Sequence, residues 1–267
     1  MSRERTFRTE AIVMRRTDFG EADRLLTLFS REKGKIKAIA KGARKPQSRK
    51  TGHVELFTRA TLFVAVGRDL GIITQAETVE AHALLRQDLV RATYAAYFVE
   101  LLDRFIGEDD PHAGIYQLLS DALIWLTVME TAELPLAARY YELRLLNLTG
   151  FQPRLFHCVA CQEAITEQDQ FFSAELGGLL CPNCYEADRN SRPVTAVMVK
   201  VLRYLQSRPW DTVKVLRLKR PLPSQLETIM HHYLTYTLER NLKSVDFLHR
   251  LRREADLLLS KEDKKDR

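Results

Sequence analysis

Residues 34–42 run Gly34-Lys-Ile-Lys-Ala-Ile-Ala-Lys-Gly42, so that charged and apolar side chains alternate along the chain. Because successive side chains of a β-strand point to opposite faces, this alternation predicts a strand over residues 35–41 with one lysine-bearing face and one apolar face. The lysine-bearing face holds Lys35, Lys37, Ile39 and Lys41. The apolar face, which we expect to point into a core, holds Ile36, Ala38 and Ala40.

Four further runs rich in β-branched and aromatic residues surround this strand, and glycine-containing turns separate them. They are residues 11–14, 25–29, 61–66 and 72–79. Five short strands within about 75 residues favour a small barrel, since closure removes exposed sheet edges. We therefore predict an α+β protein that begins with a five-stranded, OB-type β-barrel domain at residues 1–81.

From residue 82 onward the apolar residues recur at helical rather than strand spacing. Helices are predicted over residues 84–105, from Asp110-Pro111 to about residue 130, and over residues 135–148, which together suggest a bundle. Helical stripes return at residues 198–205 and 226–234, and Ser244 fits the cap of a last helix. We expect a helical domain at residues 82–260 with a small insert at about residues 156–186, followed by a charged tail at residues 261–267.

The basic charge of the chain is concentrated at one end. Residues 1–50 hold 15 Lys and Arg against 6 Asp and Glu, whereas the remaining 217 residues hold 26 against 29. The overall balance, 45% hydrophobic and 28% charged residues, is that of an ordinary globular protein. No apolar run approaches the roughly 20 residues of a membrane span, and no secretory signal is visible. We expect a cytoplasmic protein without a membrane partner, whose basic end binds a polyanion.

All four cysteines fall in the predicted insert as two C-x2-C pairs. Cys158 and Cys161 form the first pair, Cys181 and Cys184 form the second, and 19 residues separate the pairs. This spacing is typical of a four-cysteine zinc site, in which each pair contributes two thiolates to one tetrahedral ion. Because four thiolates leave no open coordination position, we predict one structural Zn²⁺ without catalytic chemistry.

Other roles of the four cysteines are disulfide bonds, free or redox-active thiols, and an iron–sulfur cluster. A reducing cytoplasm disfavours disulfides, and iron–sulfur clusters are usually held by tighter and less symmetric spacings. His157 adjoins Cys158 and is interpreted as a neighbour of the site rather than a ligand.

Nine basic residues and a single acidic one lie between Arg31 and Lys50. After the predicted strand, residues 41–50 form a Gly- and Pro-punctuated segment with little apolar content and no acid. Such a segment gains free energy by neutralising phosphates and releasing their counterions, whereas no dense aromatic platform for base stacking accompanies it. The pattern predicts nucleic-acid binding that is mainly electrostatic and weakly sequence-specific. The alternative is a merely solvated, charged face.

The sequence lacks the motifs of several enzyme classes, and we expect a protein that is not an enzyme. A phosphate-binding G-x-x-x-x-G-K-[ST] loop, H-E-x-x-H and G-x-S-x-G are all absent. His53-Val-Glu55 hints at a zinc deaminase, but Leu180 stands where that signature has proline, and the first cysteine pair would have no role. Asp109-Asp110 is an adjacent acidic pair, yet it lies where a helix cap is expected, which disfavours a metal-dependent nuclease. A zinc-ribbon regulatory or RNA-processing factor remains the alternative.

Several segments resemble the RecO family of bacterial recombination mediators. They are Phe19-Gly-Glu-Ala-Asp-Arg-Leu-Leu-Thr-Leu-Phe-Ser-Arg-Glu-Lys-Gly-Lys35, Ala40-Lys-Gly-Ala-Arg-Lys45, Gly67-Arg-Asp-Leu70 and the two cysteine pairs, set between helices. The resemblance extends from about residue 6 to residue 250. It implies an OB-fold domain, a helical domain that carries the zinc module, and a role in DNA repair by homologous recombination through the RecF pathway.

The resemblance also implies partners and contact residues. It implies binding of single- and double-stranded DNA, annealing of complementary strands without ATP, and help in loading the recombinase RecA onto DNA coated with single-stranded-DNA-binding protein. RecR and the C-terminal tail of the single-stranded-DNA-binding protein are the implied protein partners, and a nucleoid-associated location follows. The matching DNA contacts are Lys35, Lys37, Lys41, Arg44 and Lys45, and charge alone extends them to Arg49 and Lys50.

Overall fold

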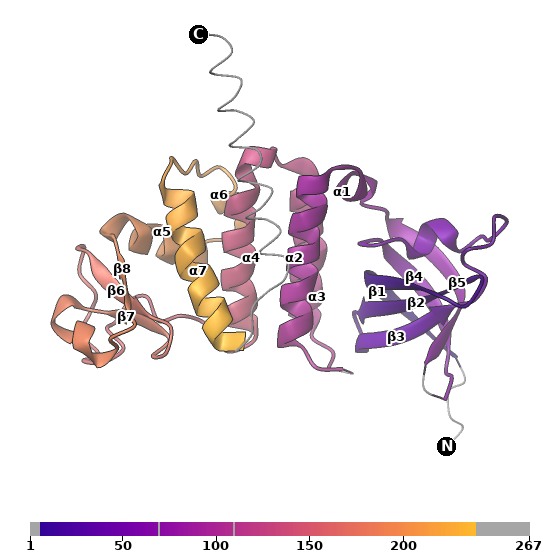
Figure 1. The fold of residues 1–267 in the computed structure, drawn as a ribbon, viewed down its shortest axis with the longest axis horizontal. Helices are drawn as coiled ribbons and strands as arrows, with labels where there is room; N and C mark the ends of the chain where they lie inside the picture. Colours follow the sequence, from indigo (N-terminus) through magenta and orange to yellow (C-terminus); the bar gives the residue numbers. More distant parts are fainter. Residues whose placement is uncertain (1–5, 69, 109, 239–267) are drawn as a thin grey trace, which may run out of the picture. The chain divides into compact units, whose positions relative to one another are not determined.

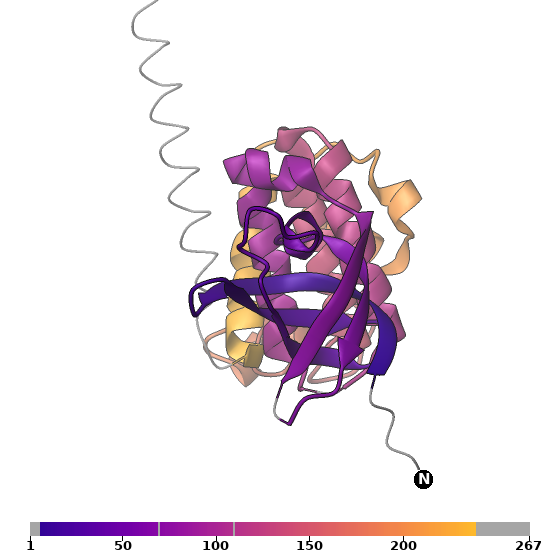
Figure 2. The same ribbon diagram turned by 90° about the vertical axis from the view of Figure 1, so that its right-hand side faces the viewer.

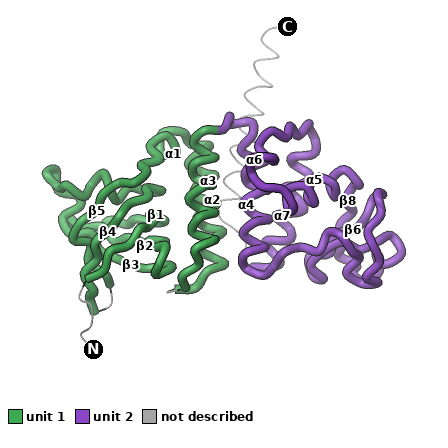
Figure 3. Tube along the Cα trace, turned by 180° about the vertical axis from the view of Figure 1, so that it is seen from behind, with its two compact units in different colours: residues 1–128, 244–267 green, residues 129–243 purple. Residues whose placement is uncertain are grey.

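The computed structural model of the protein describes residues 6–68, 70–108 and 110–238 (Figure 1). These residues fall into two compact units, one ending at Val128 and the other beginning at Met129 (Figure 3). The predicted domain boundary between residues 81 and 82 lies within the first unit, between its last strand and its first helix. That these two parts are separate domains stays a prediction. The predicted helix from Ser244 and the tail at residues 261–267 lie outside the described residues.

The first unit begins with a closed five-stranded barrel, as the sequence predicts (Figure 2). Around the barrel the strand order is β1-β2-β3-β5-β4. The only parallel pair, β3 with β5, closes the barrel, and the other neighbours are antiparallel. This is the strand number and closure of an OB-type barrel. The strands are β1 (Thr6–Phe19), β2 (Asp23–Ser30), β3 (Gly34–Ala40), β4 (Arg59–Ala65) and β5 (Gly71–Glu80), with a short 3-10 helix η1 (Thr51–Val54) between β3 and β4.

Side-chain alternation fills the barrel in the way that the sequence of β3 predicts. Ala38 and Ala40 are fully buried, whereas Lys37 on the opposite face is exposed. Small side chains on β3 leave room for larger ones from the facing strands, so that the interior is tightly packed. The core is formed by Ala11, Val13, Leu26, Leu28, Ala38, Ala40, Ala43, Val54, Ala60, Leu62, Val64 and Ile73.

Three helices complete the first unit: α1 (Ala83–Gln87), α2 (Leu89–Phe105) and α3 (Ala113–Val128). The helical pattern predicted as one run over residues 84–105 is broken at Asp88, whose side chain accepts a hydrogen bond from the Arg91 amide at 3.0 Å and so caps α2. The predicted start of the next helix at Asp110-Pro111 is also corrected. That helix begins at Ala113, and His112 Nδ1 accepts a hydrogen bond from the Ile115 amide at 3.3 Å.

The second unit combines helices with a small sheet. After a 3-10 turn, η2 (Thr131–Glu133), come α4 (Leu134–Leu148), α5 (Ala196–Ser207), α6 (Trp210–Val213) and α7 (Leu222–Leu238). Helix α4 packs against α5 and α7. A three-stranded sheet with the order β7-β6-β8 lies in the segment between α4 and α5. Its elements are β6 (Gln170–Ser173), β7 (Gly178–Leu180), the 3-10 helix η3 (Pro182–Ala187) and β8 (Arg192–Val194). Among the helices of the described residues, none combines the length and apolar character that crossing a bilayer requires.

Candidate nucleic-acid interface and metal centre

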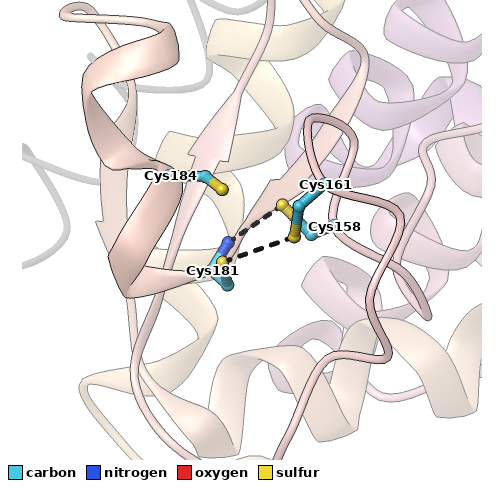
Figure 4. A group of neighbouring side chains, drawn as sticks. All are labelled: Cys158, Cys161, Cys181 and Cys184. Carbon is cyan, nitrogen blue, oxygen red and sulfur yellow. Dashed lines mark hydrogen bonds between the residues drawn. The ribbon is translucent and has the colours of Figure 1, made fainter.

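The four cysteines converge on one point of the second unit, as the two C-x2-C pairs predict (Figure 4). Their Sγ atoms all lie within 4.8 Å of one another. Cys158 and Cys161 lie in the segment between α4 and β6, Cys181 follows β7 directly, and Cys184 lies in η3. All four are free thiols, so the disulfide alternative is not realised in this structure.

The geometry of the cluster fits a tetrahedral metal ion. Four thiolates at the usual Zn–S distance of about 2.3 Å stand about 3.8 Å apart. The Sγ atoms of Cys161 and Cys181 are 3.8 Å apart. The Cys181 amide donates a hydrogen bond to Cys158 Sγ at 3.4 Å, the kind of contact that stabilises a thiolate (Figure 4). The four residues can therefore hold a metal ion, and His157 is not part of the group.

The lowered pKa of the Cys158 thiol also fits a metal-binding role. Burial on its own raises the pKa of this thiol, but backbone amides of Cys181, Cys161 and Ala160 donate to its sulfur and together lower the pKa to about 6. Hydrogen bonding with the side chains of Cys181 and Cys161 favours the protonated thiol of Cys184 and raises its pKa to about 12. A cation among the sulfurs would favour the thiolates instead.

The cysteine module is attached to the helices of its own unit by polar contacts to its backbone. Arg203 on α5 donates through Nε to the Leu155 carbonyl at 2.8 Å, and Gln206 donates to the Pro153 carbonyl at 2.9 Å. Tyr233 on α7 donates its hydroxyl to the Phe151 carbonyl at 2.8 Å. These contacts fix the segment that leads into the cysteine pairs, so a metal there would hold a folded module in place.

The two glycines before the second cysteine pair differ in what they provide. Gly177 has a positive φ of 72° at the turn between β6 and β7. At Gly178, a Cβ would overlap the Arg154 backbone carbonyl. The Gly177-Gly178 pair therefore supplies both a left-handed turn and a close approach of two backbones.

In the first unit, the predicted DNA contacts on β3 are both engaged by α2 and the segment after it. Lys35 is half-buried, and its ammonium donates to Asp103 Oδ1 at 3.0 Å, the Asp103 carbonyl at 3.2 Å and the Ile106 carbonyl at 2.9 Å. Lys37 is exposed and forms an ion pair with Glu108. Both lysines point out of the barrel as predicted, but each already has an acceptor.

The loop after β3 presents its cations differently. Lys41, Arg44, Lys45 and Arg49 are exposed. Within the described part of the chain, no acidic side chain lies within ion-pair distance of Lys41, Lys45 or Arg49, whereas Arg44 contacts Asp18 Oδ2 at 3.3 Å. Lys50 is half-buried and donates to the Ile73 carbonyl at 3.2 Å. Three of the seven predicted DNA contacts thus present charges that nothing described neutralises.

The backbone of this loop is fixed to the barrel. The Arg44 amide donates to the Ala22 carbonyl at 2.9 Å, and Thr51 Oγ1 donates to the Ala43 carbonyl at 2.6 Å. Ala43 itself is fully buried. A loop held in this way presents its cations to a ligand without first having to be ordered.

Lys33 and Arg68 are two cations to which the sequence assigns no site. Both line a pocket at the start of β3, together with Lys35 and Lys37. They come together because the β4–β5 turn folds back to β3, where Gly71 pairs with Ala38. Long-range strand pairing of this kind leaves no local signal in the sequence, although Arg68 lies in the Gly67-Arg-Asp-Leu70 segment that carries part of the family resemblance.

The residues of the rejected enzyme motifs have structural roles where they are described. His53 Nδ1 hydrogen-bonds Thr78 of β5 at 2.7 Å, and Glu55 forms an ion pair with Arg24 at 2.8 Å. Neither residue belongs to the cysteine group. Asp109 of the acidic pair lies outside the described residues.

Comparisons with known proteins place matches along nearly the whole chain. The model "Recombination protein O N terminal" matches residues 1–82, and "Recombination protein O C terminal" matches residues 86–246. The chain is 41% identical over 246 residues to the DNA repair protein RecO of Roseiflexus sp. (strain RS-1), which covers 92% of this chain and 86% of that protein. It is 38% identical to the DNA repair protein RecO of Pelotomaculum thermopropionicum, over 91% of this chain and 94% of that protein. With the protein of the same name from Desulforamulus reducens it shares 36% identity over 92% and 94% of the two chains.

Proposed function

Because the chain belongs to the RecO family of DNA repair proteins, we propose that it binds single- and double-stranded DNA through its barrel and anneals complementary strands without ATP. The observation that carries the proposal is the fixed loop after β3, on which the charges of Lys41, Lys45 and Arg49 are not neutralised within the described residues. Phosphates of either DNA form would supply the missing counter-charge and release bound cations to solvent. Arg44 would join them by exchanging Asp18 for a phosphate.

Lys35, Lys37 and Lys50 have a different place in this proposal. Lys50 donates to a backbone carbonyl of the protein itself, so it adds positive potential more than a direct contact. Lys35 is already paired with the Asp103 carboxylate, so it is expected to contribute little of either. Lys37 reaches DNA only when its ion pair with Glu108 opens. The strongest direct contacts are therefore expected from the loop.

The metal of the cysteine cluster is proposed to be one structural Zn²⁺, held by Cys158, Cys161, Cys181 and Cys184. When bound, it supplies a tetrahedral cross-link and no reactive position. Annealing needs no bond to be made or broken in the DNA, so we propose that the protein acts by binding and not as an enzyme. The cluster then stabilises the second unit, and DNA binding is the work of the first.

The partners follow from the same role. We propose that the protein cooperates with RecR, engages the single-stranded-DNA-binding protein on coated strands and thereby helps RecA to load, in association with the nucleoid. Contact with the coat protein is supported by the fact that coated strands, unlike bare strands, already have a protein bound to them. A protein that binds through phosphates alone competes poorly with a bound coat, so remodelling requires a contact with the coat itself.

The experiment is annealing of complementary strands that have been precoated with single-stranded-DNA-binding protein, without ATP, across a salt series. Annealing of coated strands that weakens as salt rises is the expected result. DNA binding without annealing would contradict the mediator role and favour a zinc-containing nucleic-acid-binding regulator. A clear stimulation by ATP would contradict the proposal as well, because it requires a nucleotide site.

A further inference from the structure

A pocket of about 400 Å³ opens on the barrel between the start of β3 and the turn that joins β4 to β5. This volume lies in the range of sites that take small organic groups, roughly 300–1,000 Å³. Its wall is apolar where β1, β3, the end of β4 and the turn after β4 meet. The apolar lining consists of Phe7, Ile36, Val64, Val66 and Leu70.

The charged lining of the pocket is mostly cationic. Four lysine or arginine side chains and one carboxylate, that of Glu108, line it among the described residues. Lys33 lies with its ammonium 5.5 Å from the centroid of the Phe7 ring, a cation–π contact that keeps an aromatic face and a positive charge together. Val66 at the mouth is 58% exposed. A pocket with an apolar wall on one side and cations around it is complementary to a ligand that has a flat apolar part and an anionic part.

Glu108 shows where an anion is held. Its carboxylate pairs with Lys37, and the hydrogen bond and charge of Lys37 hold the pKa of Glu108 below its usual value. The backbone around Glu108 runs beside β3, forming a parallel bridge with Lys35. At Gly34 a Cβ would overlap the backbone of Asp110. A segment of the protein itself therefore places a carboxylate on Lys37 at the rim of the pocket.

We propose that this pocket binds one unstacked nucleotide of single-stranded DNA, with the base against the apolar wall and the adjoining phosphate on Lys37 in place of the Glu108 carboxylate. The inference rests on the proposed function and deepens it, because it gives single strands a contact that a duplex lacks. In a duplex the bases are paired and stacked, so they cannot enter a pocket without being unstacked first. Lys33 and Arg68 then face the phosphates on either side.

The test compares single-stranded and duplex binding in the full-length protein, using a fluorescent oligo-dT and a blunt-ended linear duplex with a similar number of phosphates. Val66→Trp fills the mouth of the pocket from an exposed position. Excluding one base from the pocket is expected to weaken oligo-dT binding by about tenfold or more. Duplex binding should stay within about twofold, since it depends on phosphate contacts. Val79→Trp is the matched control, because Val79 is also exposed on the barrel but does not line the pocket.

A second variant tests the exchange of anions. Glu108→Gln removes the competing carboxylate and should tighten oligo-dT binding more than Glu77→Gln, which removes the same charge from an exposed position of β5 that does not line the pocket. Equal effects of Glu108→Gln and Glu77→Gln would contradict the exchange and leave only general electrostatics. Unchanged oligo-dT binding by Val66→Trp would overturn the pocket while DNA binding itself stands. A wild-type protein that binds neither DNA would instead overturn the proposed function.

Discussion

At the scale of single residues, Gly34 is the position where local sequence and long-range packing meet. It has a positive φ of 68° at the turn into β3, and its α-carbon lies against the backbone of Asp110. The turn alone explains a glycine, but only the structure shows that the acidic segment after α2 packs there. Glycine is therefore required twice at this position, once by the backbone angle and once by space.

Gly34→Ala should lower the free energy of unfolding by at least about 2 kcal/mol, because a strained left-handed alanine is added to an overlap with Asp110. Gly20→Ala is the control, since Gly20 also has a positive φ, of 57°, but a Cβ there meets nothing within 4 Å. That variant should lose only about 1 kcal/mol. Chemical denaturation of both variants measures the difference, and equal losses would show that the acidic segment does not lie against β3.

His82 predicts a pH dependence of stability. Burial is the main cause that lowers its pKa from 6.5 to about 4, and the charges of Arg59 and Arg86 act in the same direction while Glu80 opposes them. The folded state therefore binds this proton less readily than the unfolded state does. Stability from this group is fully present above pH 6.5 and is lost as the pH falls through 4, by roughly 3 kcal/mol at most.

His82→Asn is the variant that measures this contribution. His82 has a positive φ of 45°, which asparagine tolerates better than most residues, and asparagine does not titrate. Between pH 6.5 and pH 4 the variant should lose less stability than the wild type, as followed by thermal melts at each pH. Parallel melting curves of the two proteins across that range would contradict the assignment.

The seven predicted DNA contacts show how far residue patterns can be taken. Alternation along β3 correctly placed Lys35 and Lys37 outside the barrel core. It could not show that Lys35 donates to Asp103 and Ile106, because these acceptors lie about 70 residues further along the chain. As DNA contacts, all seven residues stay predictions, and the structure distinguishes among them by the acceptors that each already has.

At the scale of elements, the strands and the cysteine cluster could be predicted because each depends on a local pattern. Period-two alternation with turn residues gave the five strands, and the two C-x2-C spacings gave the cluster. The break between α1 and α2 could not be predicted from periodicity, since apolar residues continue across Asp88. The small sheet β7-β6-β8 was also missed, because strands of three or four residues carry too little pattern.

The metal of the cysteine module gives a prediction at this scale. Cys158→Ser together with Cys161→Ser should abolish stoichiometric zinc and lower the melting temperature of the second unit, because the ion cross-links segments that the fold alone holds less tightly. Oligo-dT binding should change little, since the loop after β3 belongs to the first unit. Elemental analysis and calorimetry measure the two effects.

A chelator provides the control for this variant. It should lower the melting temperature of the wild type and have no further effect on the double serine variant. Wild-type protein prepared without chelators that contains no stoichiometric zinc would contradict the metal assignment.

At the scale of the whole molecule, charge is divided unequally along the chain. The first 50 residues carry 15 Lys and Arg against 6 Asp and Glu, whereas the rest of the chain has more acidic than basic residues. The structure places seven of these basic residues on β3 and the loop that follows. Composition alone predicted a basic end. Composition cannot reveal ion pairs such as Lys37 with Glu108. These ion pairs determine which cations are already neutralised and which are presented to a ligand.

The most direct test of DNA binding through the loop is the salt dependence of affinity for a single-stranded oligonucleotide. The loop variant combines Lys41→Gln, Lys45→Gln and Arg49→Gln. Its slope of log affinity against log salt should be shallower than that of the wild type by about 2, because each phosphate that the protein no longer neutralises removes roughly 0.7 from the slope. The charge-matched control is Arg189→Gln, Arg192→Gln, Lys219→Gln, which removes three exposed cations of the second unit and should leave the slope nearly unchanged. A shallower slope in the loop variant alone is the predicted result, and equal slopes in wild type and loop variant would contradict it.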